Sequence, residues 1–399
     1  MAGVDAEVVI VGAGPVGLVA AYRLNRFGIS TIVIESNAAL PRDLRASTFH
    51  PPTLDMLAQY GLAAPLIAQG RICPTWQIRI HETGERAVFD LAVLNGETDH
   101  PYRLQCEQFR LCHVLEGALA DAEHVDLRLG TELIGFEQDE SGVTVRARGA
   151  GGEESIRCNI LVGADGARSR VREQLDLAFE GVTYPETTIL ATTTFPFEDH
   201  IPDLANVTYF WSKDGTFSLL RLPSIWRCSI YPDAGESIEE ATRPEVVRAK
   251  MQRIAPAAAD SDLLEIRPYR VHMRIVDNYR RGRVVLAGDA AHVNSPSGGM
   301  GMNGGIHDAY SLTETLRQIL GGGSLDLLDR YTRQRRPIAA QEVLAQADRN
   351  RARMQERDPA KRRAMLRELQ DQMNDPVRAK AYLMRSSMID GLRRSHMLT

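Results

Sequence analysis

A glycine-rich turn close to the start of the chain has the residue types and the spacing that bind a phosphate group. Residues 12–17, GAGPVG, directly follow the apolar run Val8–Val11 and open a segment with helical periodicity. Gly12 permits a tight turn, Gly14 carries no side chain that would block a pyrophosphate, and Gly17 lets the helix approach the strand. The first N–H groups of such a helix have no partner within it, so they offer hydrogen bonds and positive partial charge to phosphates.

An acidic residue completes this pattern. Thr31–Ile34 has the composition of a second buried strand, and Glu35 follows at its end, 23 positions after Gly12. A carboxylate there can accept hydrogen bonds from the ribose of an adenosine. The strand, turn, helix, strand and acid together predict the binding of a dinucleotide, but they do not distinguish FAD from NAD.

Two further turns combine glycine with aspartate at the ends of apolar strands. Ile160–Val162 runs into Gly163-Ala-Asp165-Gly166, and the segment 283–287, RVVLA, runs into Gly288-Asp289. A glycine-rich loop over residues 296–305 follows the second of these turns. Turns of this kind at the ends of parallel strands predict that residues far apart in the sequence meet in one site.

The pattern between these turns predicts two kinds of sheet. Short alternating segments dominate from about 176 to 275, which is typical of an antiparallel sheet. On either side of them, buried apolar strands alternate with helical segments, the last of which is expected from about Ile306 to Leu320. From about residue 326 the chain is mostly helical and rich in charge, and we expect three prolines to divide it, Pro337, Pro359 and Pro376.

Composition excludes several classes of protein. The chain has 399 residues, 44% hydrophobic and 25% charged, with a formal net charge of -5, which is ordinary for globular domains. No basic excess would draw it to nucleic acid. Its five cysteines are scattered, which predicts neither disulfides nor a zinc site and favours a reducing cytoplasm. Glycine and proline interrupt the apolar run near the N-terminus, so no membrane span is expected.

In their order and spacing, the three motifs resemble those of the single-component (class A) FAD-dependent aromatic hydroxylases, the para-hydroxybenzoate hydroxylase-like monooxygenases. The resemblance spans about residues 7–340. It implies an α/β fold with a Rossmann-like FAD-binding domain, an inserted antiparallel β-sheet substrate domain and C-terminal helices. The implied boundaries are 1–80, 104–175 and 276–345 for the discontinuous FAD-binding domain, 81–103 and 176–275 for the substrate-binding sheet, and 346–399 for the helical segment.

The resemblance also assigns residues to FAD. Asp289 matches the acid that bonds the ribityl chain, and Asp165 matches a turn near the pyrophosphate. Arg45 matches an arginine packed on the pyrophosphate, Gln108 a glutamine that reaches FAD from the start of a helix, and Leu133 a backbone contact to adenine. The residues expected to bind FAD are Gly12, Ala13, Gly14, Pro15, Val16, Gly17, Glu35, Ser36, Arg45, Gln108, Leu133, Asp165, Asp289, Gly299, Gly301, Met302 and Asn303.

A loop and a sheet are expected around the reacting part of the flavin. Residues 296–305 match the loop that wraps the isoalloxazine ring in the family. The resemblance implies that the helix after this loop points its positive end at the N1–C2=O edge of the ring. Many relatives have two adjacent prolines where this chain has Ser295-Pro296. Arg227 resembles an arginine near the mobile flavin, and His50 is a candidate base for the phenol. His50 is alternatively a surface residue.

These resemblances complete the expected site. The catalytic candidates are His50, Arg227 and Pro296, and the expected substrate contacts are Tyr209, Trp211 and Arg221. Tyr209 and Trp211 lie on an alternating strand, so they are alternatively plain residues of the sheet. No metal ligands and no Ser-His-Asp arrangement stand out.

The resemblance implies an FAD- and NAD(P)H-dependent monooxygenase that hydroxylates a phenolic or heteroaromatic small molecule through a flavin C4a-hydroperoxide, with dioxygen as co-substrate. The chain has one GxGxxG motif, so NADPH or NADH is expected to react from a transient surface site. The alternatives are a flavin-dependent epoxidase or halogenase-like oxidase, although the halogenase motif Trp-x-Trp-x-Ile-Pro is absent, and a non-catalytic flavoprotein. The charged helical tail is expected either to cap the fold or to form a homodimer.

Overall fold

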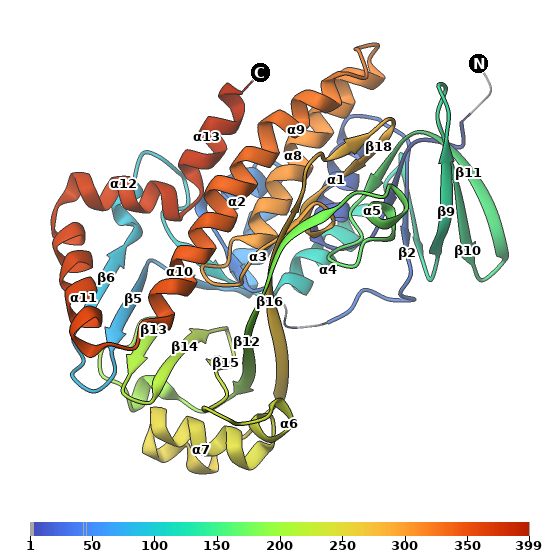
Figure 1. Ribbon diagram of the computed structural model, residues 1–399. Helices are drawn as coiled ribbons and strands as arrows, with labels where there is room; N and C mark the ends of the chain where they lie inside the picture. Colours follow the sequence, from blue (N-terminus) through green and yellow to red (C-terminus); the bar gives the residue numbers. More distant parts are fainter. Residues whose placement is uncertain (1–3, 43, 45, 399) are drawn as a thin grey trace.

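A parallel sheet carries the first glycine-rich turn. The computed structural model describes residues 4–42, 44 and 46–398, and this sheet lies at the end of the molecule where the chain begins (Figure 1). The strands predicted at Val8–Val11 and Thr31–Ile34 are confirmed as β1 and β2, which pair in parallel. In the order β18-β11-β1-β2-β8, the parallel strands are β18 Val284–Leu286, β11 Gly152–Gly163, β1 Ala6–Val11, β2 Thr31–Glu35 and β8 Val125–Leu129, with the short antiparallel β17 Arg280–Arg281 at one edge.

The helices on this sheet follow the predicted pattern, with one difference. α1 Pro15–Arg26 lies between α4 Gln108–Leu119 and α8 Gly301–Leu320. α8 was expected to begin near Ile306, but it begins at Gly301. The prediction missed the first turn because its sequence, GMNGG, has low helix propensity. Packing of α8 against α1 holds this turn in the helix. Smaller elements complete this part of the chain: β3 Thr48–Phe49, α2 Pro51–Ala58, α3 Ala63–Gln69, β4 Arg71–Cys73, β7 Arg103–Gln105, α5 Arg170–Gln174 and the 3-10 turn η4 Gly288–Ala290.

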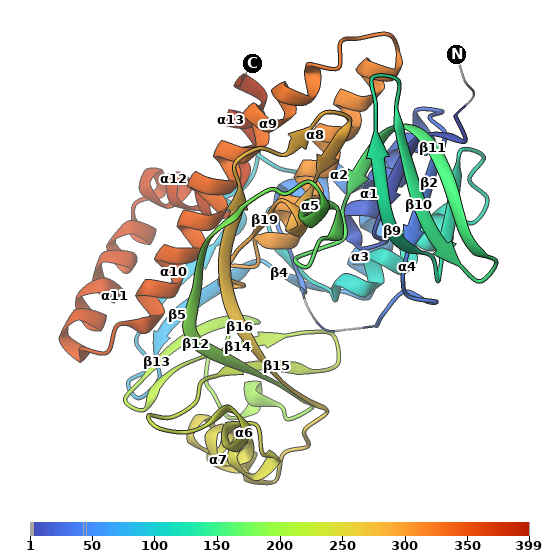
Figure 2. The ribbon, with the colours of Figure 1, turned by 45° about the vertical axis from the view of Figure 1, so that its right-hand side comes forward.

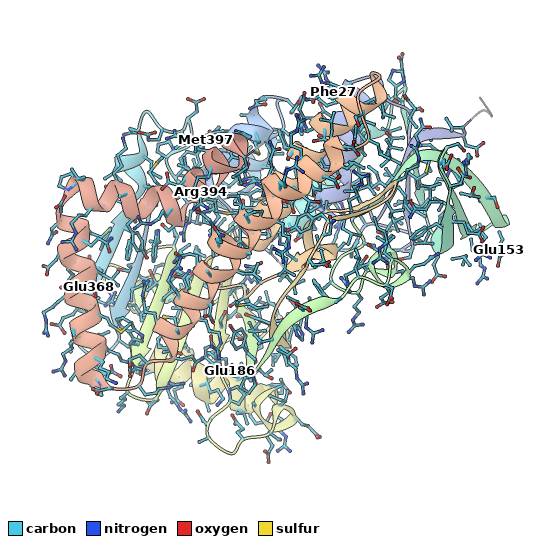
Figure 3. All side chains as sticks on the ribbon, turned by 45° about the horizontal axis from the view of Figure 1, so that its top comes forward. Phe27, Glu153, Glu186, Glu368, Arg394 and Met397 are labelled. Atoms are coloured by element: carbon cyan, nitrogen blue, oxygen red, sulfur yellow. The ribbon has the colours of Figure 1, made fainter. Side chains whose placement is uncertain are left out.

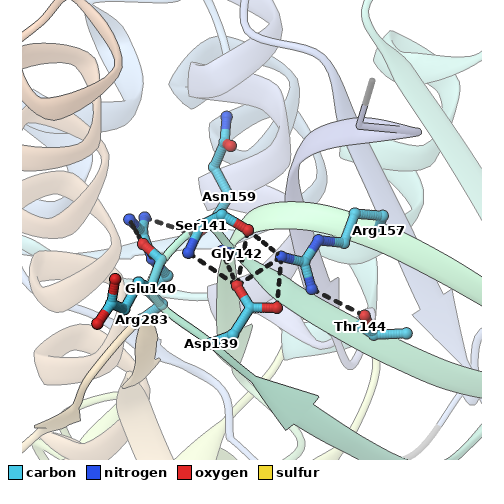
Figure 4. A network of polar contacts seen from close by, with 8 residues as sticks. All are labelled: Asp139, Glu140, Ser141, Gly142, Thr144, Arg157, Asn159 and Arg283. Carbon is cyan, nitrogen blue, oxygen red and sulfur yellow. Dashed lines mark hydrogen bonds and ion pairs between the residues drawn. The ribbon is translucent and has the colours of Figure 1, made fainter. Parts of the chain in front are cut away.

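A hairpin extends the parallel sheet at β11. Its strands are β9 Glu132–Gln138 and β10 Val143–Gly149, and they contribute buried apolar side chains to the same core as β1. A polar network fixes the turn (Figure 4): Asp139 accepts hydrogen bonds from the Ser141 N–H at 2.7 Å and from the Arg157 guanidinium at 2.7 Å. Arg283, just before β18, donates to the Glu140 carbonyl at 3.1 Å, so the turn is tied to the strand that leads to Asp289.

The second sheet is antiparallel with one exception. Its order is β19-β16-β12-β15-β14-β13-β5-β6, and among the described strands of this sheet one pair, β13 and β5, runs parallel. The long strands β12 and β16 pair along their length and connect the two ends of the molecule (Figure 2). The bounds are β5 Thr75–Ile80, β6 Arg86–Asp90, β12 Phe179–Thr193, β13 Val207–Ser212, β14 Gly215–Arg221, β15 Trp226–Ile230, β16 Glu265–Val276 and β19 His292–Val293.

One predicted boundary does not follow these pairings. Residues up to 80 were assigned to the FAD-binding domain, yet β5 pairs with β6 and β13 and therefore lies in the second sheet. The partner strand β13 lies more than a hundred positions further along the chain, so no local pattern indicates the pairing. In this part of the chain, the second sheet thus includes β5 and β6.

Alternation along its strands gives the second sheet two different faces. One face is apolar and packs on α7 Pro244–Ile254, with Phe210, Cys228 and Met251 among the buried side chains. The opposite face carries Tyr209 and Arg227, which are directed at a cavity described below. Around this sheet lie the short helix α6 Ile238–Ala241 and the 3-10 turns η1 Leu91–Leu94, η2 Phe197–Asp199 and η3 Pro256–Asp260.

The C-terminal helices cap the second sheet. α10 Ala345–Gln355, α11 Pro359–Asn374 and α12 Pro376–Ser386 contact β13, β6 and η1 respectively, and α13 Ile389–Met397 packs on α9 Leu327–Ile338. Glu368 on α11 and Met397 on α13 lie on the outside of this layer (Figure 3). Within the described ranges, no helix is both long enough and apolar enough to cross a membrane.

The prolines of this region act in two ways. Pro359 and Pro376 each begin a helix, because the first helical position needs no N–H donor. Pro337, in contrast, lies inside α9, which continues through a π-helical turn at Ala339–Leu344 into α10. The expected division at Pro337 is therefore wrong: the wider turn directly after it accommodates the proline without ending the helix.

Candidate active site

A cavity of about 520 Å³ lies between the carboxyl ends of the parallel strands and the second sheet. All three predicted turns reach it, through Gly12 and Gly14 after β1, Asp165 after β11 and Asp289 after β18. This edge is where α/β sheets bind their ligands. The opposite wall comes from β12 to β16, so both sheets contribute to one site.

The glycines of the first turn are required for different structural reasons. Gly12 has a φ of 103°, and a Cβ at this position would lie 2.5 Å from the Ala164 carbonyl oxygen. A Cβ on Gly17 would lie 2.0 Å from the Gly12 carbonyl oxygen. A Cβ on Gly14 would meet no atom of the other described residues within 4 Å, because Gly14 borders the cavity. Gly12 and Gly17 thus permit the fold, whereas Gly14 keeps space free for a ligand.

Two helices begin at this cavity. Neither α1 nor α8 has a hydrogen bond from an N-cap side chain, so the N–H groups of both first turns are available to a ligand. Both helix dipoles present their positive ends to the cavity, where they favour negative charge. The first two residues of each helix line the cavity, namely Pro15, Val16, Gly301 and Met302.

Glu35 lines the cavity, as expected, and also fixes the first turn. Its Oε2 accepts a hydrogen bond from the Ala13 N–H at 2.9 Å, and its Oε1 accepts one from the Asn37 N–H at 2.9 Å. Ser36 lies beside it in the cavity wall. A carboxylate has further lone pairs, so Glu35 can still accept hydrogen bonds from a ribose.

The two aspartates differ in burial. Asp165 is largely buried, which raises the pKa of its carboxyl group, and its Oδ2 accepts a hydrogen bond from the Val171 N–H at 3.2 Å. Its Oδ1 has no hydrogen-bond partner among the described residues. Asp289 lies on η4 with an exposed side chain at the cavity. The unpartnered oxygen, the open space at Gly14 and the two helix N-termini are features that fit a bound FAD.

The loop between β19 and α8 is held from behind by two buried side chains. The amide of Asn303 donates to the Gly299 carbonyl at 2.7 Å and to the Thr48 carbonyl at 2.8 Å, and its Oδ1 accepts from the His50 N–H at 2.9 Å. The His50 Nε2 contacts the Gly298 carbonyl at 2.8 Å. Burial, and then the charge of Arg103, lowers the pKa of His50 to about 3, so its ring is neutral near pH 7.

Polar side chains of the second sheet form the other wall. Arg227 is buried, and its Nη1 donates to the Ser47 Oγ at 2.8 Å. Burial lowers the pKa of Arg227 and raises that of Tyr209. Glu186, labelled in Figure 3, forms an ion pair with Arg351 of α10, so the C-terminal helices close one side of the cavity.

Most of the predicted site residues line this cavity, and six of those that the structure describes do not. Those that line it are Gly12, Ala13, Gly14, Pro15, Val16, Glu35, Ser36, Gln108, Asp165, Tyr209, Arg227, Asp289, Pro296, Gly299, Gly301 and Met302. Gly17, His50 and Asn303 support it from behind, and Leu133 lies in β9 with its carbonyl accepting from Arg170 at 3.0 Å. Arg45 lies outside the described residues.

Two expected substrate contacts point elsewhere. Trp211 is fully buried beneath the C-terminal helices, and its Nε1 donates to the Arg353 carbonyl at 3.1 Å. Arg221, the last residue of β14, pairs with Glu198 at 3.0 Å and lies over the ring of Trp226. Neither residue lines the cavity, so the structure does not support their predicted role as substrate contacts.

Sequence reasoning missed several residues of the second wall. The cavity-facing positions of β12 to β16 and of α10 include Thr188, Ser218, Ser229, Tyr231, Tyr269, Met354 and Gln355. Alternation within each strand could have indicated these sets, once the face that carries Tyr209 and Arg227 was known. Nothing local in the sequence shows that α10 closes the site.

Comparison with known proteins agrees with this geometry. The profile of a family described as "FAD binding domain" matches residues 5–346. The chain is 34% identical over 362 residues to para-nitrophenol 4-monooxygenase of Pseudomonas sp. (strain WBC-3), covering 89% of each chain. It is 32% identical to 6-hydroxy-3-succinoylpyridine 3-monooxygenase of Pseudomonas putida (strain S16), covering 83% of this chain and 84% of that one.

A solved structure shares the architecture as well. The crystal structure of p-nitrophenol 4-monooxygenase from Pseudomonas putida DLL-E4 superposes with a TM-score of 0.90 at 31% sequence identity. The match covers 97% of this chain and 98% of that chain. Both sheets and the C-terminal helices are therefore part of the likeness.

Proposed function

The chain belongs to the class A FAD-dependent aromatic hydroxylases, and from this premise we propose that it hydroxylates a phenolic or heteroaromatic small molecule, using FAD, NADH or NADPH and dioxygen. The observation that carries the proposal is the single cavity shared by the dinucleotide motifs and the polar face of the second sheet. By their names, two relatives act on a nitrophenol and on a hydroxypyridine derivative. Epoxidase, halogenase-like and non-catalytic alternatives are not favoured by these relatives.

We propose that the parallel-sheet side holds FAD. The α1 N-terminus would bind the pyrophosphate, Glu35 the adenosine ribose, and Asp289 the ribityl chain, while the α8 N-terminus would face the negative edge of the reduced ring. Bound FAD supplies the oxygen-transfer chemistry, because a reduced flavin reacts with dioxygen. The residues around it would position the ring and supply charge where negative charge develops.

The second wall would bind the substrate and exclude water. Pro296 and Gly299 bring the loop between β19 and α8 to the cavity, and Arg227 places a buried positive charge opposite it. His50 does not line the cavity, and its neutral ring holds Gly298. We therefore propose His50 as a positioning residue for the loop rather than as the base that reacts with the phenol.

The proposal is tested on the purified chain. We expect flavin absorption bands, slow NAD(P)H oxidation alone, and faster oxidation when the correct aromatic compound is added. With ¹⁸O-labelled dioxygen, mass spectrometry of the product should show one labelled oxygen atom. A flavin-free preparation that cannot be reconstituted with FAD would contradict the cofactor assignment, and a broad aromatic panel without stimulation would contradict the hydroxylase assignment.

Three broader features follow as proposals. The FAD-binding domain is proposed to be discontinuous, with the second sheet, including β5, as the substrate-binding unit. A cytoplasmic location is supported by the five cysteines, which are all buried and no two of which are joined by a disulfide in the described part of the chain. The tail helices cap the second sheet, and a homodimer stays a prediction that sedimentation of the purified protein would test.

A further inference from the structure

A smaller cavity opens beside the large one. It has a volume of about 30 Å³ and shares Tyr209, Ser297 and Met354 with the large cavity. Trp76 and Arg103 are among its other lining residues. A water molecule needs on the order of 10–15 Å³ measured in this way, so the space admits a group of two or three heavy atoms but not an aromatic ring.

Arg103 is a buried cation at this small cavity. The residue is 3% exposed, and its guanidinium lies over the ring of Trp76, 4.8 Å from the ring centre. Within the described part of the chain, no carboxylate forms an ion pair with it, and its Nε is buried without an acceptor. Burial lowers the pKa of Arg103, and the ionisable groups that interact with its charge are two tyrosines, His50 and Cys73, none of them a carboxylate. Burial raises the pKa of Cys73 to about 12.

The other buried arginines each have a hydrogen-bond acceptor for at least part of the guanidinium. Among the described residues six further arginines are buried, and each donates at least one side-chain hydrogen bond within the protein, although single nitrogens such as the Nε of Arg79 also lack an acceptor. Arg335 pairs with Asp308 at 2.7 Å, and Arg79 donates to the Pro202 carbonyl at 2.9 Å. A buried guanidinium without such a partner is unfavourable, because it has lost its hydration without gaining a compensating contact. Arg103 therefore has the features of a group that receives its partner from a ligand.

We propose that Arg103 binds a negatively charged oxygen of the aromatic substrate, seated in the small cavity while the ring occupies the large one. The inference rests on the proposed function and narrows its substrate class to aromatic anions. The charged oxygen belongs either to a carboxylate substituent or to an ionised phenol. Tyr209 lines both cavities, and Gly298, in the loop between β19 and α8, lines the small one. An anion bound in the small cavity would therefore lie next to that loop.

The first test compares matched ligands on the FAD-loaded enzyme. Binding is measured by the change in flavin absorbance for 4-hydroxybenzoate against 4-hydroxybenzamide, and for 4-nitrophenol against phenol. We expect the anionic member of at least one pair to bind more tightly than its neutral counterpart, and Arg103→Met to weaken that anionic member roughly 10- to 100-fold while changing the neutral one little. Arg103→Lys should keep part of the preference. Equal affinities in the original enzyme, or a preference that survives in Arg103→Met, would overturn the proposal.

The two sources of the charged oxygen are separated by pH. If Arg103 binds a phenolate, the absorbance of bound 4-nitrophenol should report ionisation at a lower pH than in free solution, and Arg103→Met should remove that shift. If it binds a carboxylate, 4-hydroxybenzoate should keep its advantage over the amide at a pH where its phenol is neutral. Either result supports the proposal, and the absence of both contradicts it.

A second test needs no turnover. Benzoate should raise the thermal unfolding temperature of the holoenzyme more than benzamide does, and this difference should vanish in Arg103→Met. Ligand-free Arg103→Met should unfold at no lower temperature than the original chain, since the change removes an uncompensated buried charge. Arg79→Met is the matched control, because it also removes a buried arginine but lies outside both cavities; it should lower the unfolding temperature and keep the benzoate effect.

The outcomes distinguish this proposal from the proposed function. If FAD binds and no aromatic compound stimulates NAD(P)H oxidation, the hydroxylase assignment fails, while the benzoate comparison still decides the role of Arg103. If stimulation occurs with neutral and anionic aromatics alike, the hydroxylase assignment stands and the Arg103 proposal fails. A marked loss of stability in ligand-free Arg103→Met would show a structural role and would also overturn it.

Discussion

The two ends of the large cavity are built in different ways. At the parallel sheet, the wall consists largely of backbone: glycine turns, the first N–H groups of α1 and α8, and carboxylates such as Asp289 at the ends of strands. At the second sheet, the wall consists of side chains from strands that are far apart in the sequence, such as Tyr209 and Tyr269. The first end suits an invariant cofactor, and the second can change its ligand by substitution.

This difference has a physical consequence for mutation. A backbone wall depends on space, so adding one carbon atom can destroy it. A side-chain wall tolerates replacement of one residue, because neighbouring strands keep their pairing and register. Changes at the parallel sheet should therefore affect folding or FAD retention, and changes at the second sheet should affect substrate binding.

The largest effect is expected from Gly17→Ala. Its Cβ would lie 2.0 Å from the Gly12 carbonyl oxygen, so the helix and the turn would have to separate. We expect a loss of about 3 kcal/mol in the free energy of unfolding, measured by denaturant titration. Gly14→Ala is the matched control: its Cβ meets no atom of the other described residues within 4 Å, and the backbone of Gly14 is in a region open to alanine.

Gly14→Ala should change stability by about 1 kcal/mol or less and yet lose FAD. The ratio of flavin to protein absorbance in the purified variant measures this loss. Full FAD content in Gly14→Ala would place the pyrophosphate elsewhere. Unchanged stability in Gly17→Ala would show that the close contact between α1 and the turn relaxes at little cost.

Asp289→Ala is expected to have the next largest effect. A hydrogen bond to a charged group contributes about 1.5–3 kcal/mol, so FAD should dissociate roughly 10- to 100-fold more readily. Flavin fluorescence after dilution measures the dissociation. Asp329→Ala, which removes an aspartate paired with Arg280 away from the cavity, should keep FAD. If Asp289→Ala also retained all of its FAD, the ribityl assignment would be incorrect.

The same contrast explains how far the sequence could be interpreted. Gly12, Asp165 and Asp289 could be assigned from sequence because each sits in a local turn whose backbone demands leave a pattern of glycines and apolar strands. Tyr269 and Arg103 could not, because the face that each side chain takes depends on the register between distant strands. Trp211 shows the limit of alternation, since it lies two residues from Tyr209 on the same face but is covered by the C-terminal helices.

Fold class followed from sequence for a related reason. The change from buried apolar strands to alternating ones marks the insertion between the parallel strands, and both patterns arise from which faces are covered. The membership of β5 in the second sheet leaves no such mark, because parallel pairing with β13 joins segments distant in the chain. The continuation of the helix through Pro337 depends on a π-helical turn that propensity does not predict.

A smaller effect, dependent on pH, is expected at the loop support. Burial lowers the pKa of His50 from 6.5 to about 3, so between these values the unfolded chain binds a proton that the folded chain does not. The free energy of unfolding should therefore be highest above pH 6.5 and fall as pH decreases, by about 1.4 kcal/mol per unit from this group. His50→Gln, whose amide can still donate to the Gly298 carbonyl, should reduce that slope.

The variant also tests the role of His50 in the reaction. As a positioning residue, His50 can be replaced by Gln with retention of most of the substrate-stimulated NAD(P)H oxidation and of the shape of the pH–rate profile. If His50 were the base, His50→Gln would lose this activity, because an amide does not accept the proton of the phenol at neutral pH. Loss of activity together with a changed pH–rate profile would restore His50 to the catalytic candidates.

The smallest effects are expected from two aromatic residues of β13, Tyr209 and Trp211. They distinguish the part of β13 that binds substrate from the part that the C-terminal helices cover. Tyr209→Phe should weaken substrate binding roughly 2- to 10-fold, with little change in stability, since the phenol borders both cavities. Trp211→Phe removes the bond to the Arg353 carbonyl and should cost about 1–2 kcal/mol of unfolding free energy while leaving substrate affinity unchanged. Denaturant titration and ligand titration of both variants separate the two roles. If Trp211→Phe instead weakened substrate binding at full stability, the C-terminal helices would not cover this face in solution, and the substrate wall would extend further along β13 than the cavity indicates.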